Sequence, residues 1–278
     1  MQVLRTVAEM RAARAGYSDV GFVPTMGYLH AGHMSLVARA KAECATVAAS
    51  IFVNPTQFGP NEDLSRYPRD MPRDLGLLEA AGVDFVFAPE PAEMYPPGFD
   101  LSIIVGGVTG VLEGAVRPGH FAGVATVVAK LFNIVQPTRA YFGQKDAQQS
   151  VVIRKLVRDL DIPVEVVVAP TVREADGLAL SSRNSYLTPE QRVVAPVIFR
   201  ALSEAKRRFD AGERDAGALR DATRDTIAGE PQLQVDYVSA ADPLTLRELE
   251  TVERQALVSV AVRLGATRLI DNLILGET

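Results

Sequence analysis

The sequence predicts an α/β protein, with a doubly wound parallel sheet over residues 1–172 and a smaller α+β domain over residues 173–278. In the first part, apolar runs of strand length alternate with segments of helical periodicity, which is typical of a parallel sheet with right-handed crossovers. In the second part, two helical segments precede three strand-like runs. The order of predicted elements thus changes from alternating strands and helices to helices followed by strands. The predicted junction between the two parts is the polar stretch 173–185.

The strands of the first domain are predicted from short runs rich in Val, Ile, Phe and Ala. Such runs are typical of strands that are buried on both faces of a sheet. We expect strands at residues 19–25, 46–55, 83–89, 101–105, 139–143 and 163–171.

The helices of the first domain are predicted between these strands, at residues 32–44, 70–82, 123–136 and 146–160. Gly82 and Pro137 stand where two of them should end, because Gly and Pro are common C-terminal helix signals. Residues 1–18 show a charged, helix-like pattern.

The second domain opens with a strong helix start. Thr188, Pro189 and Gln191 combine a capping side chain, a proline at the first helical position and a glutamine three residues after the cap. A long helix should continue from here through residues 195–212, and a second helix should begin at Asp215. We expect the strands at residues 233–240, 255–265 and 267–275.

The composition limits the functional classes. The chain has 278 residues, 47% hydrophobic and 23% charged, which is the balance of a soluble globular protein. No apolar run approaches the roughly 18 residues of a membrane span, and the N-terminus lacks the features of a secretory signal. The single cysteine, Cys44, fits a reducing cytoplasm. A net charge of −5 without a basic block or any Trp argues against nucleic-acid binding.

Two of the three histidines, His30 and His33, lie between a predicted strand and a predicted helix. In doubly wound sheets, ligands bind beyond the carboxyl ends of strands. Gly27 and Gly32 allow close approach of the backbone to a ligand, and a helix N-terminus favours an anion through its free N–H groups and its dipole. Two imidazoles at this position indicate a phosphate site.

Other sites at this position are weaker hypotheses. The segment matches neither a Walker-type phosphate loop nor the G-x-G-x-x-G dinucleotide fingerprint. A zinc pair is an alternative, but further His or Cys ligands are scarce in a chain with three His and one Cys.

Polar side chains also gather after other predicted strands. Asn54 and Gln57 follow the strand at 46–55, and Lys145 and Asp146 precede a helix whose first turn carries Gln148 and Gln149. Other such residues are the glycine-flanked His120 and the group Ser181, Ser182 and Arg183 in the junction. Each has a structural explanation, as a turn former, a helix cap or a solvated loop. Four polar loops at four strand ends nevertheless favour one Rossmann-like ligand site.

Five segments, in order and over residues 23–187, resemble the pantoate–β-alanine ligase family, also called pantothenate synthetases. They are PTMGYLHAGHMSL, FVNPTQFGPNEDLSRYPR, RPGHFAGVATVV, FGQKDAQQ and VREADGLALSSRNSYL. The His30-x-x-His33 pattern by itself is shared with the wider nucleotidyltransferase superfamily. Gln144 stands where many family members have Glu.

The resemblance implies an ATP-dependent ligase that acts in two steps. Pantoate and ATP would give pantoyl adenylate and pyrophosphate, and β-alanine would then displace AMP to give pantothenate. It also implies Mg²⁺ as the counter-ion of the phosphates, with protein ligands unknown, and a homodimer. The expected partners are therefore these small molecules, with neither nucleic acid nor membrane.

The resemblance also implies roles for single residues. His33 is the family's assigned proton donor, with His30 and Lys145 beside it in the catalytic set. Gln57 and Gln149 would hold pantoate, and Gln57 would lie near β-alanine too. The residues that would contact ATP are Met26, Gly27, Tyr28, Leu29, His30, Ala31, Gly32, His33, Gly143, Gln144, Lys145, Asp146, Val172, Leu180, Ser181, Ser182 and Arg183. Of these, Leu180, Ser181, Ser182 and Arg183 belong to the domain of residues 173–278, which is expected to act as a lid over ATP.

Two alternatives stay open from the residues alone. One is a nucleotidyltransferase that passes AMP to a phosphorylated acceptor, for which a more basic acceptor pocket would be expected. The other is a nucleotide-binding module without catalysis, for which decay at His30, His33 or Lys145 would be expected, although all three are present.

Overall fold

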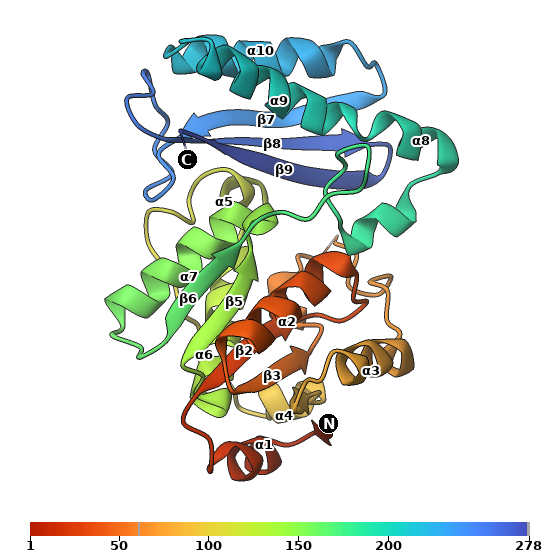
Figure 1. Ribbon diagram of the computed structural model, residues 1–278, viewed down its shortest axis with the longest axis vertical. Helices are drawn as coiled ribbons and strands as arrows, with labels where there is room; N and C mark the ends of the chain where they lie inside the picture. Colours follow the sequence, from red (N-terminus) through yellow and green to blue (C-terminus); the bar gives the residue numbers. More distant parts are fainter. Residues whose placement is uncertain (61, 277–278) are drawn as a thin grey trace. The chain divides into compact units, whose positions relative to one another are not determined.

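The computed structural model describes residues 1–60 and 62–276. They form two compact units, one of residues 1–143 with 152–170 and one of residues 144–151 with 171–278 (Figure 1). The predicted fold class is confirmed, because a parallel sheet with helices is followed by a small antiparallel sheet with helices. The domain boundary predicted at residue 172 stays a prediction.

The first unit contains a six-stranded parallel sheet in the order β1-β4-β3-β2-β5-β6. Its strands are β1 Gln2–Leu4, β2 Val20–Thr25, β3 Thr46–Ile51, β4 Phe85–Phe87, β5 Arg139–Gly143 and β6 Glu165–Ala169. The order reverses between β2 and β5, which makes their carboxyl ends the switch point where doubly wound sheets bind ligands. The segment from Met26 follows β2 at this point, and Gly143 ends β5 there.

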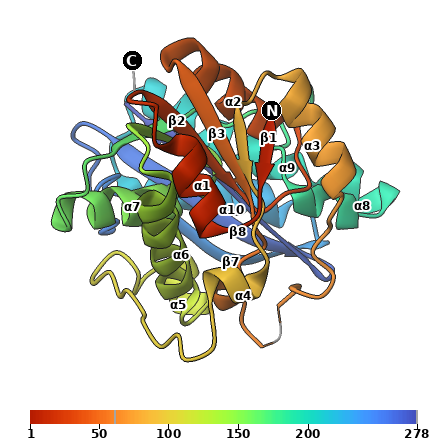
Figure 2. The ribbon, with the colours of Figure 1, turned by 90° about the horizontal axis from the view of Figure 1, so that it is seen from below.

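Helices cover both faces of this sheet. The helices between Val7 and Asp159 are α1 Val7–Arg14, α2 Ala31–Glu43, α3 Met71–Ala80, α4 Pro91–Met94, α5 Glu113–Val116, α6 His120–Val135 and α7 Ala147–Asp159, with the short 3-10 helix η1 at Pro55–Gln57. Figure 2 shows α2 and α3 on one face and α1 and α6 on the other. Val37 of α2, Leu78 of α3 and Val23 of β2 belong to one buried apolar cluster, so burial of this face fixes both helices on the sheet.

The strand predicted at residues 101–105 is wrong, and a strand at the N-terminus was missed. Residues 101–105 form no strand, and the Ile103 N–H donates to Thr126 Oγ1 of α6 at 2.9 Å. Ile104 is 81% exposed, so the apolar run does not enter the sheet. The sixth strand is β1 instead, which pairs in parallel with β4.

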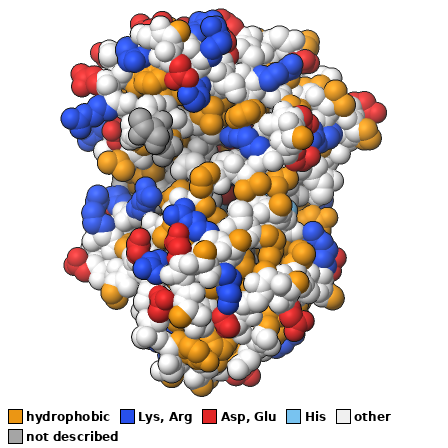
Figure 3. All heavy atoms as spheres, in the orientation of Figure 1, with side chains coloured by type: hydrophobic (Ala, Val, Ile, Leu, Met, Phe, Trp, Pro, Cys, Tyr) orange, Lys and Arg blue, Asp and Glu red, His pale blue; other side chains and the backbone are white. Residues whose placement is uncertain are grey.

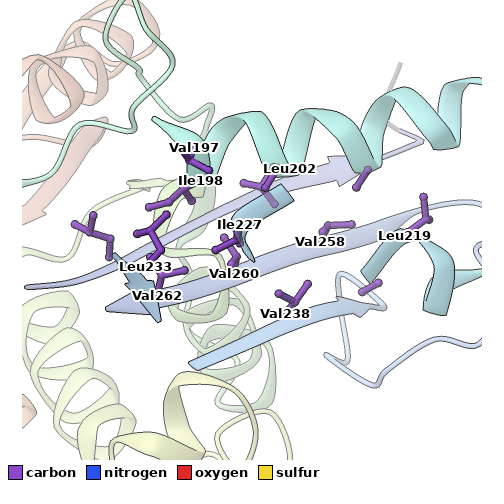
Figure 4. Packing of buried hydrophobic residues seen from close by; sticks show 14 of the residues in the cluster. Val197, Ile198, Leu202, Leu219, Ile227, Leu233, Val238, Val258, Val260 and Val262 are labelled. Carbon is purple, nitrogen blue, oxygen red and sulfur yellow. The ribbon is translucent and has the colours of Figure 1, made fainter. Parts of the chain in front are cut away.

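The second unit has a three-stranded antiparallel sheet in the order β7-β8-β9. Its elements are η2 Gln144–Asp146, η3 Ser182–Tyr186, α8 Pro189–Val194, α9 Val197–Asp210, α10 Ala216–Ala228, β7 Leu233–Ala241, β8 Ala256–Leu264 and β9 Thr267–Leu275. Figure 4 shows side chains of β8 packed with those of α9 and α10, and this cluster is the core of the unit.

The helix start predicted at Thr188 is confirmed by a capping box with Gln191. The single long helix expected after it is divided into α8 and α9 at Pro196. Proline lacks the N–H that would continue the helical hydrogen bonds, which explains the break.

No helix among the described residues is long and apolar enough to cross a membrane. On the face shown in Figure 3, Lys and Arg side chains lie among Asp and Glu side chains rather than in one basic field.

Candidate functional site

The loop between β2 and α2 has a tightly specified backbone. Gly27 has a φ of 83°, and a Cβ there would lie 3.0 Å from Ile51 Cγ2 and 3.1 Å from Asp74 Oδ2. Tyr28 also lies in the left-handed region, with a φ of 51°. Because non-glycine residues rarely adopt this conformation, neighbouring contacts must hold the loop in place.

Asp74, in the first turn of α3, supplies these contacts. Its carboxylate accepts the N–H of Tyr28 at 2.6 Å and the N–H of Leu29 at 2.8 Å, and only 1% of the residue is exposed. The adjacent Arg73 donates to the Leu29 carbonyl at 2.9 Å. No sequence pattern indicates this role, since an acid in a first helical turn is ordinary.

His30 and His33 form a capping box at the start of α2. His30 Nδ1 accepts the N–H of Gly32 at 3.1 Å, and His33 Nδ1 accepts the N–H of His30 at 3.3 Å. The ring centroids are 4.0 Å apart. The N–H groups expected to be free for an anion are therefore partly used by the histidines, because unpaired N–H groups at a helix start favour a capping partner.

This capping fixes the tautomers of both rings. A ring nitrogen that accepts an N–H carries no proton, so each neutral imidazole carries its proton on Nε2. The N–H donor of each ring is therefore at Nε2, near the positive end of the dipole of α2. Such donors are suited to phosphate oxygens on which negative charge develops.

Gln57 lies in the same unit, at the end of η1 after β3. Its Oε1 accepts from Asn54 Nδ2 at 3.0 Å, and its Nε2 contacts Met26 Sδ at 3.2 Å. The structure therefore brings Gln57 together with the loop that carries the histidines.

The side-chain amide of Asn54 makes several hydrogen bonds within the protein. Its Oδ1 accepts from Tyr95 OH at 2.7 Å and Thr56 Oγ1 at 2.9 Å, and its Nδ2 also donates to the Gly123 carbonyl at 3.2 Å. A Cβ at Gly123 would lie 2.4 Å from the Thr56 carbonyl oxygen, so only glycine lets α6 approach η1 this closely. These contacts, with Asn54 as the cap of η1, agree with the turn-forming explanation of Asn54.

His120 stands in a network that the sequence did not reveal. Arg117 forms a two-pronged ion pair with Glu62, with Nε and Nη2 at 2.7 and 2.6 Å from its oxygens. Arg117 Nη1 lies 3.1 Å from His120 Nε2, and His120 Nδ1 lies 2.8 Å from the Gln57 carbonyl. Since guanidinium only donates and a carbonyl only accepts, His120 is neutral with its proton on Nδ1. The network holds the backbone of Gln57.

Burial and the Arg117 charge lower the pKa of His120 from its ordinary 6.5 to about 4. As the pH falls, the unfolded chain therefore binds a proton at His120 before the folded chain does. The free energy of unfolding decreases as the pH drops from about 6.5 towards about 4. We expect His120→Asn, which keeps a donor for the Gln57 carbonyl, to lose this dependence. Between pH 7 and pH 5 the wild-type free energy of unfolding should fall by about 2 kcal/mol more than that of the variant. Urea unfolding at several pH values measures it, and parallel pH profiles would contradict the neutral histidine.

Gly143, at the end of β5, is the last nucleotide candidate in the first unit, and the other nucleotide candidates and the pantoate candidate Gln149 lie in the second unit. Gln144, Lys145 and Asp146 form η2, with Lys145 Nζ 3.3 Å from Asp146 Oδ1, and Gln149 is half-buried in the first part of α7. Gln144 Nε2 donates to Asn272 Oδ1 of β9 at 3.0 Å, so its side chain has a structural partner.

The candidates in the junction form a compact turn. The Leu180 N–H donates to the Val172 carbonyl at 3.0 Å, and Ser181 caps η3 by accepting the Arg183 N–H at 3.3 Å. Ser182 is buried and Arg183 is half-buried. The nucleotide candidates of the junction therefore lie together in one small folded segment. They are Val172, Leu180, Ser181, Ser182 and Arg183.

The described part of the chain holds no group of three or more His, Cys, Asp or Glu side chains that would bind a metal ion. His30 and His33 belong to no such group among these residues.

Comparison with known proteins gives a consistent result. The profile of a family described as Pantoate-beta-alanine ligase matches residues 2–274. A pantothenate synthetase of Herpetosiphon aurantiacus is 65% identical over 276 residues, which cover 99% of this chain and 100% of that protein. The crystal structure of pantothenate synthetase from Thermus thermophilus has a TM-score of 0.95 at 54% identity and covers 98% of this chain and 99% of that one. A pantoate-beta-alanine ligase from Francisella tularensis, complexed with beta-gamma ATP and beta-alanine, has a TM-score of 0.82 at 35% identity, over 100% of this chain and 98% of that one.

Proposed function

The chain belongs to the pantoate-beta-alanine ligase family, and we propose that it joins pantoate to β-alanine in two steps, through a pantoyl adenylate. The observation that carries the adenylation step is the His30–His33 pair, whose Nδ1 atoms are occupied by backbone N–H groups and whose Nε2–H groups therefore serve as donors. Family membership favours this reaction over AMP transfer to a phosphorylated acceptor and over a module without catalysis.

In the first step, a carboxylate oxygen of pantoate attacks the α-phosphorus of ATP. The new P–O bond forms as the bond to pyrophosphate breaks, and negative charge develops on the phosphate oxygens. We assign to His33 and His30 the donation of hydrogen bonds to these oxygens, and to Lys145 a positive charge on a phosphate. Gln57 and Gln149 hold pantoate through their amides. The chemistry is mainly positioning, because the reaction needs no protein nucleophile.

In the second step, the amine of β-alanine attacks the acyl carbon of the adenylate. The amide bond forms, AMP leaves, and the amine gives up a proton. Gln57 is assigned a place near this amine. The Francisella tularensis relative is complexed with beta-gamma ATP and beta-alanine, which supports a subsite for each of these substrates. Val172 and the segment Leu180–Arg183 are assigned to closure over ATP, which would protect the adenylate from water.

Mg²⁺ fits this scheme as a companion of the triphosphate. Mg²⁺ prefers oxygen ligands and keeps several waters, so phosphate oxygens and water would supply most of its coordination. The family resemblance also supports a homodimer that works in the cytoplasm.

The direct test is a product assay. The purified protein is incubated with ATP, Mg²⁺, pantoate and β-alanine, and the products are separated by chromatography. We expect pantothenate and AMP in equal amounts, and none when any one substrate is left out. Formation of ADP instead of AMP would reject the adenylate route, because an acyl phosphate would then be the activated species.

A further inference from the structure

Two consecutive residues of β9, Asp271 and Asn272, are both buried. Neighbouring residues of a strand point to opposite faces, so burial of both means that each face is covered at this point. Asp271 is 4% exposed and Asn272 is 3% exposed. Buried polar side chains need hydrogen-bond partners. The partners of these two lie in the two second-unit segments to which ATP is assigned.

Asn272 anchors the turn η2. Its Nδ2 donates to the carbonyl oxygens of Gln144 at 3.0 Å and Lys145 at 2.9 Å, and its Oδ1 accepts from Gln144 Nε2 at 3.0 Å. Because carbonyl oxygens only accept, Nδ2 must face them, and this fixes the orientation of both amides. Three hydrogen bonds to one side chain thus hold the backbone from which Lys145 projects.

Asp271 anchors the junction segment through Arg173. The guanidinium donates to both carboxylate oxygens, with Nη1 at 2.5 Å and Nη2 at 2.9 Å. It also donates to the Gly177 carbonyl at 3.1 Å and the Asn272 carbonyl at 3.3 Å, and its central carbon lies 4.0 Å from the centre of the Phe199 ring. Such a two-pronged pair fixes direction as well as distance.

This arrangement also explains how the junction turn keeps its shape. Arg173 directly follows Val172, and the Val172 carbonyl accepts the Leu180 N–H. Fixing Arg173 therefore fixes one side of the turn on β9. The two anchors are neighbours on one strand, where residues lie about 3.3 Å apart along the chain. The backbone of β9 consequently sets the distance between η2 and the junction turn.

We propose that Asp271 and Asn272 are positioning residues for ATP, Asn272 by setting the turn that carries Lys145 and Asp271 by setting, through Arg173, the turn that carries Val172 and Leu180. This role rests on the proposed function, from which it takes the assignment of ATP to these two segments. Neither side chain is assigned a contact with the reacting atoms.

The test compares substrates within each variant. Asn272→Ala removes three hydrogen bonds, and Asp271→Asn removes the charge of the ion pair. Because each change loosens a turn to which ATP is assigned, we expect the KM for ATP to rise about tenfold or more, which corresponds to about 1.4 kcal/mol or more. The KM values for pantoate and β-alanine should stay within about twofold, which corresponds to less than about 0.5 kcal/mol. Calorimetric titration with a non-hydrolysable ATP analogue should show the same loss of affinity.

Two control variants come from the same sheet. Asp236 pairs with Arg263 and Arg268, so Asp236→Asn matches the loss of charge at Asp271 without touching either segment. Ser239 is buried, and its Oγ has no hydrogen-bond partner among the described residues, so Ser239→Ala matches the truncation of a buried polar side chain. Both should leave the KM for ATP unchanged. Thermal unfolding of every variant shows whether it is folded.

If Asn272→Ala does not fold, Asn272→Ser, which keeps one donor, takes its place. A KM for ATP within about twofold of wild type in the folded variants of Asn272 and Asp271 would overturn the positioning role. An equal rise in all three KM values would overturn it too, since it would indicate a general loss of structure. Failure of the wild-type protein to make pantothenate would reject the proposed function alone, because the analogue titration still decides the positioning role.

Discussion

Replacement of His33 by alanine is expected to slow adenylate formation by about 10²-fold or more, the usual effect of removing one preorganised transition-state donor. His33 Nδ1 already accepts the His30 N–H, so its Nε2–H is the ring group that can donate to a phosphate oxygen. Alanine offers no donor. Single-turnover measurement of pantoyl adenylate, with ATP and pantoate in excess over enzyme, isolates this step from amide formation.

A second variant separates chemistry from helix capping. His33→Ala also removes the acceptor for the His30 N–H, which costs about 0.5–2 kcal/mol of stability by analogy with other helix caps. Gln is the usual capping-box residue at this position, so His33→Gln should keep the cap and lose the imidazole. We expect His33→Gln to unfold at nearly the wild-type temperature and still to be slow in adenylation. A wild-type rate in His33→Gln would mean that the imidazole itself is not required, since glutamine keeps both the cap and an amide N–H donor.

Much of the fold is predictable because its signals are local. The strand at residues 139–143 and the helix begun by Thr188 depend on neighbours within a few residues, and both are present. The strand β1 has only three residues, and it forms by pairing with β4, which is far away in the sequence. Its own residues therefore show no periodicity that would predict a strand. The run at 101–105 has strand-like composition but finds its hydrogen bond on α6.

The candidate site also contains some residues that the sequence indicates and others that only the folded structure reveals. His30, His33, Gln57 and Lys145 lie in short motifs whose residue types indicate their chemistry. Asp74 is 45 residues from the Leu29 N–H that it accepts, and Asn272 is 128 residues from Gln144. Supporting residues of this kind look like ordinary helix or strand positions, because only the folded chain brings their partners to them.

The second prediction with a large effect is that pyrophosphate leaves ATP before the amine of β-alanine reacts. If pantoate is activated before the amine reacts, labelled pyrophosphate should enter ATP in the absence of β-alanine. The exchange should require both pantoate and Mg²⁺, because the reverse reaction needs the adenylate and the metal complex of pyrophosphate. Without pantoate we expect no exchange above background, so the effect is nearly all or none. Retention of label in ATP on charcoal measures it directly.

The structure suggests two variants for the exchange measurement. Because Gln57 lies against Met26 beside the histidine loop, Gln57→Ala should need more pantoate to reach half-maximal exchange, whereas His33→Ala should depress exchange at every pantoate concentration. A concerted reaction would show no exchange until β-alanine was added, and a transferase for a phosphorylated acceptor would exchange only with that acceptor. Either result, in protein that binds the ATP analogue, would reject the adenylate. Exchange that needs pantoate but not β-alanine requires a species in which pantoate is joined to AMP and pyrophosphate has already left.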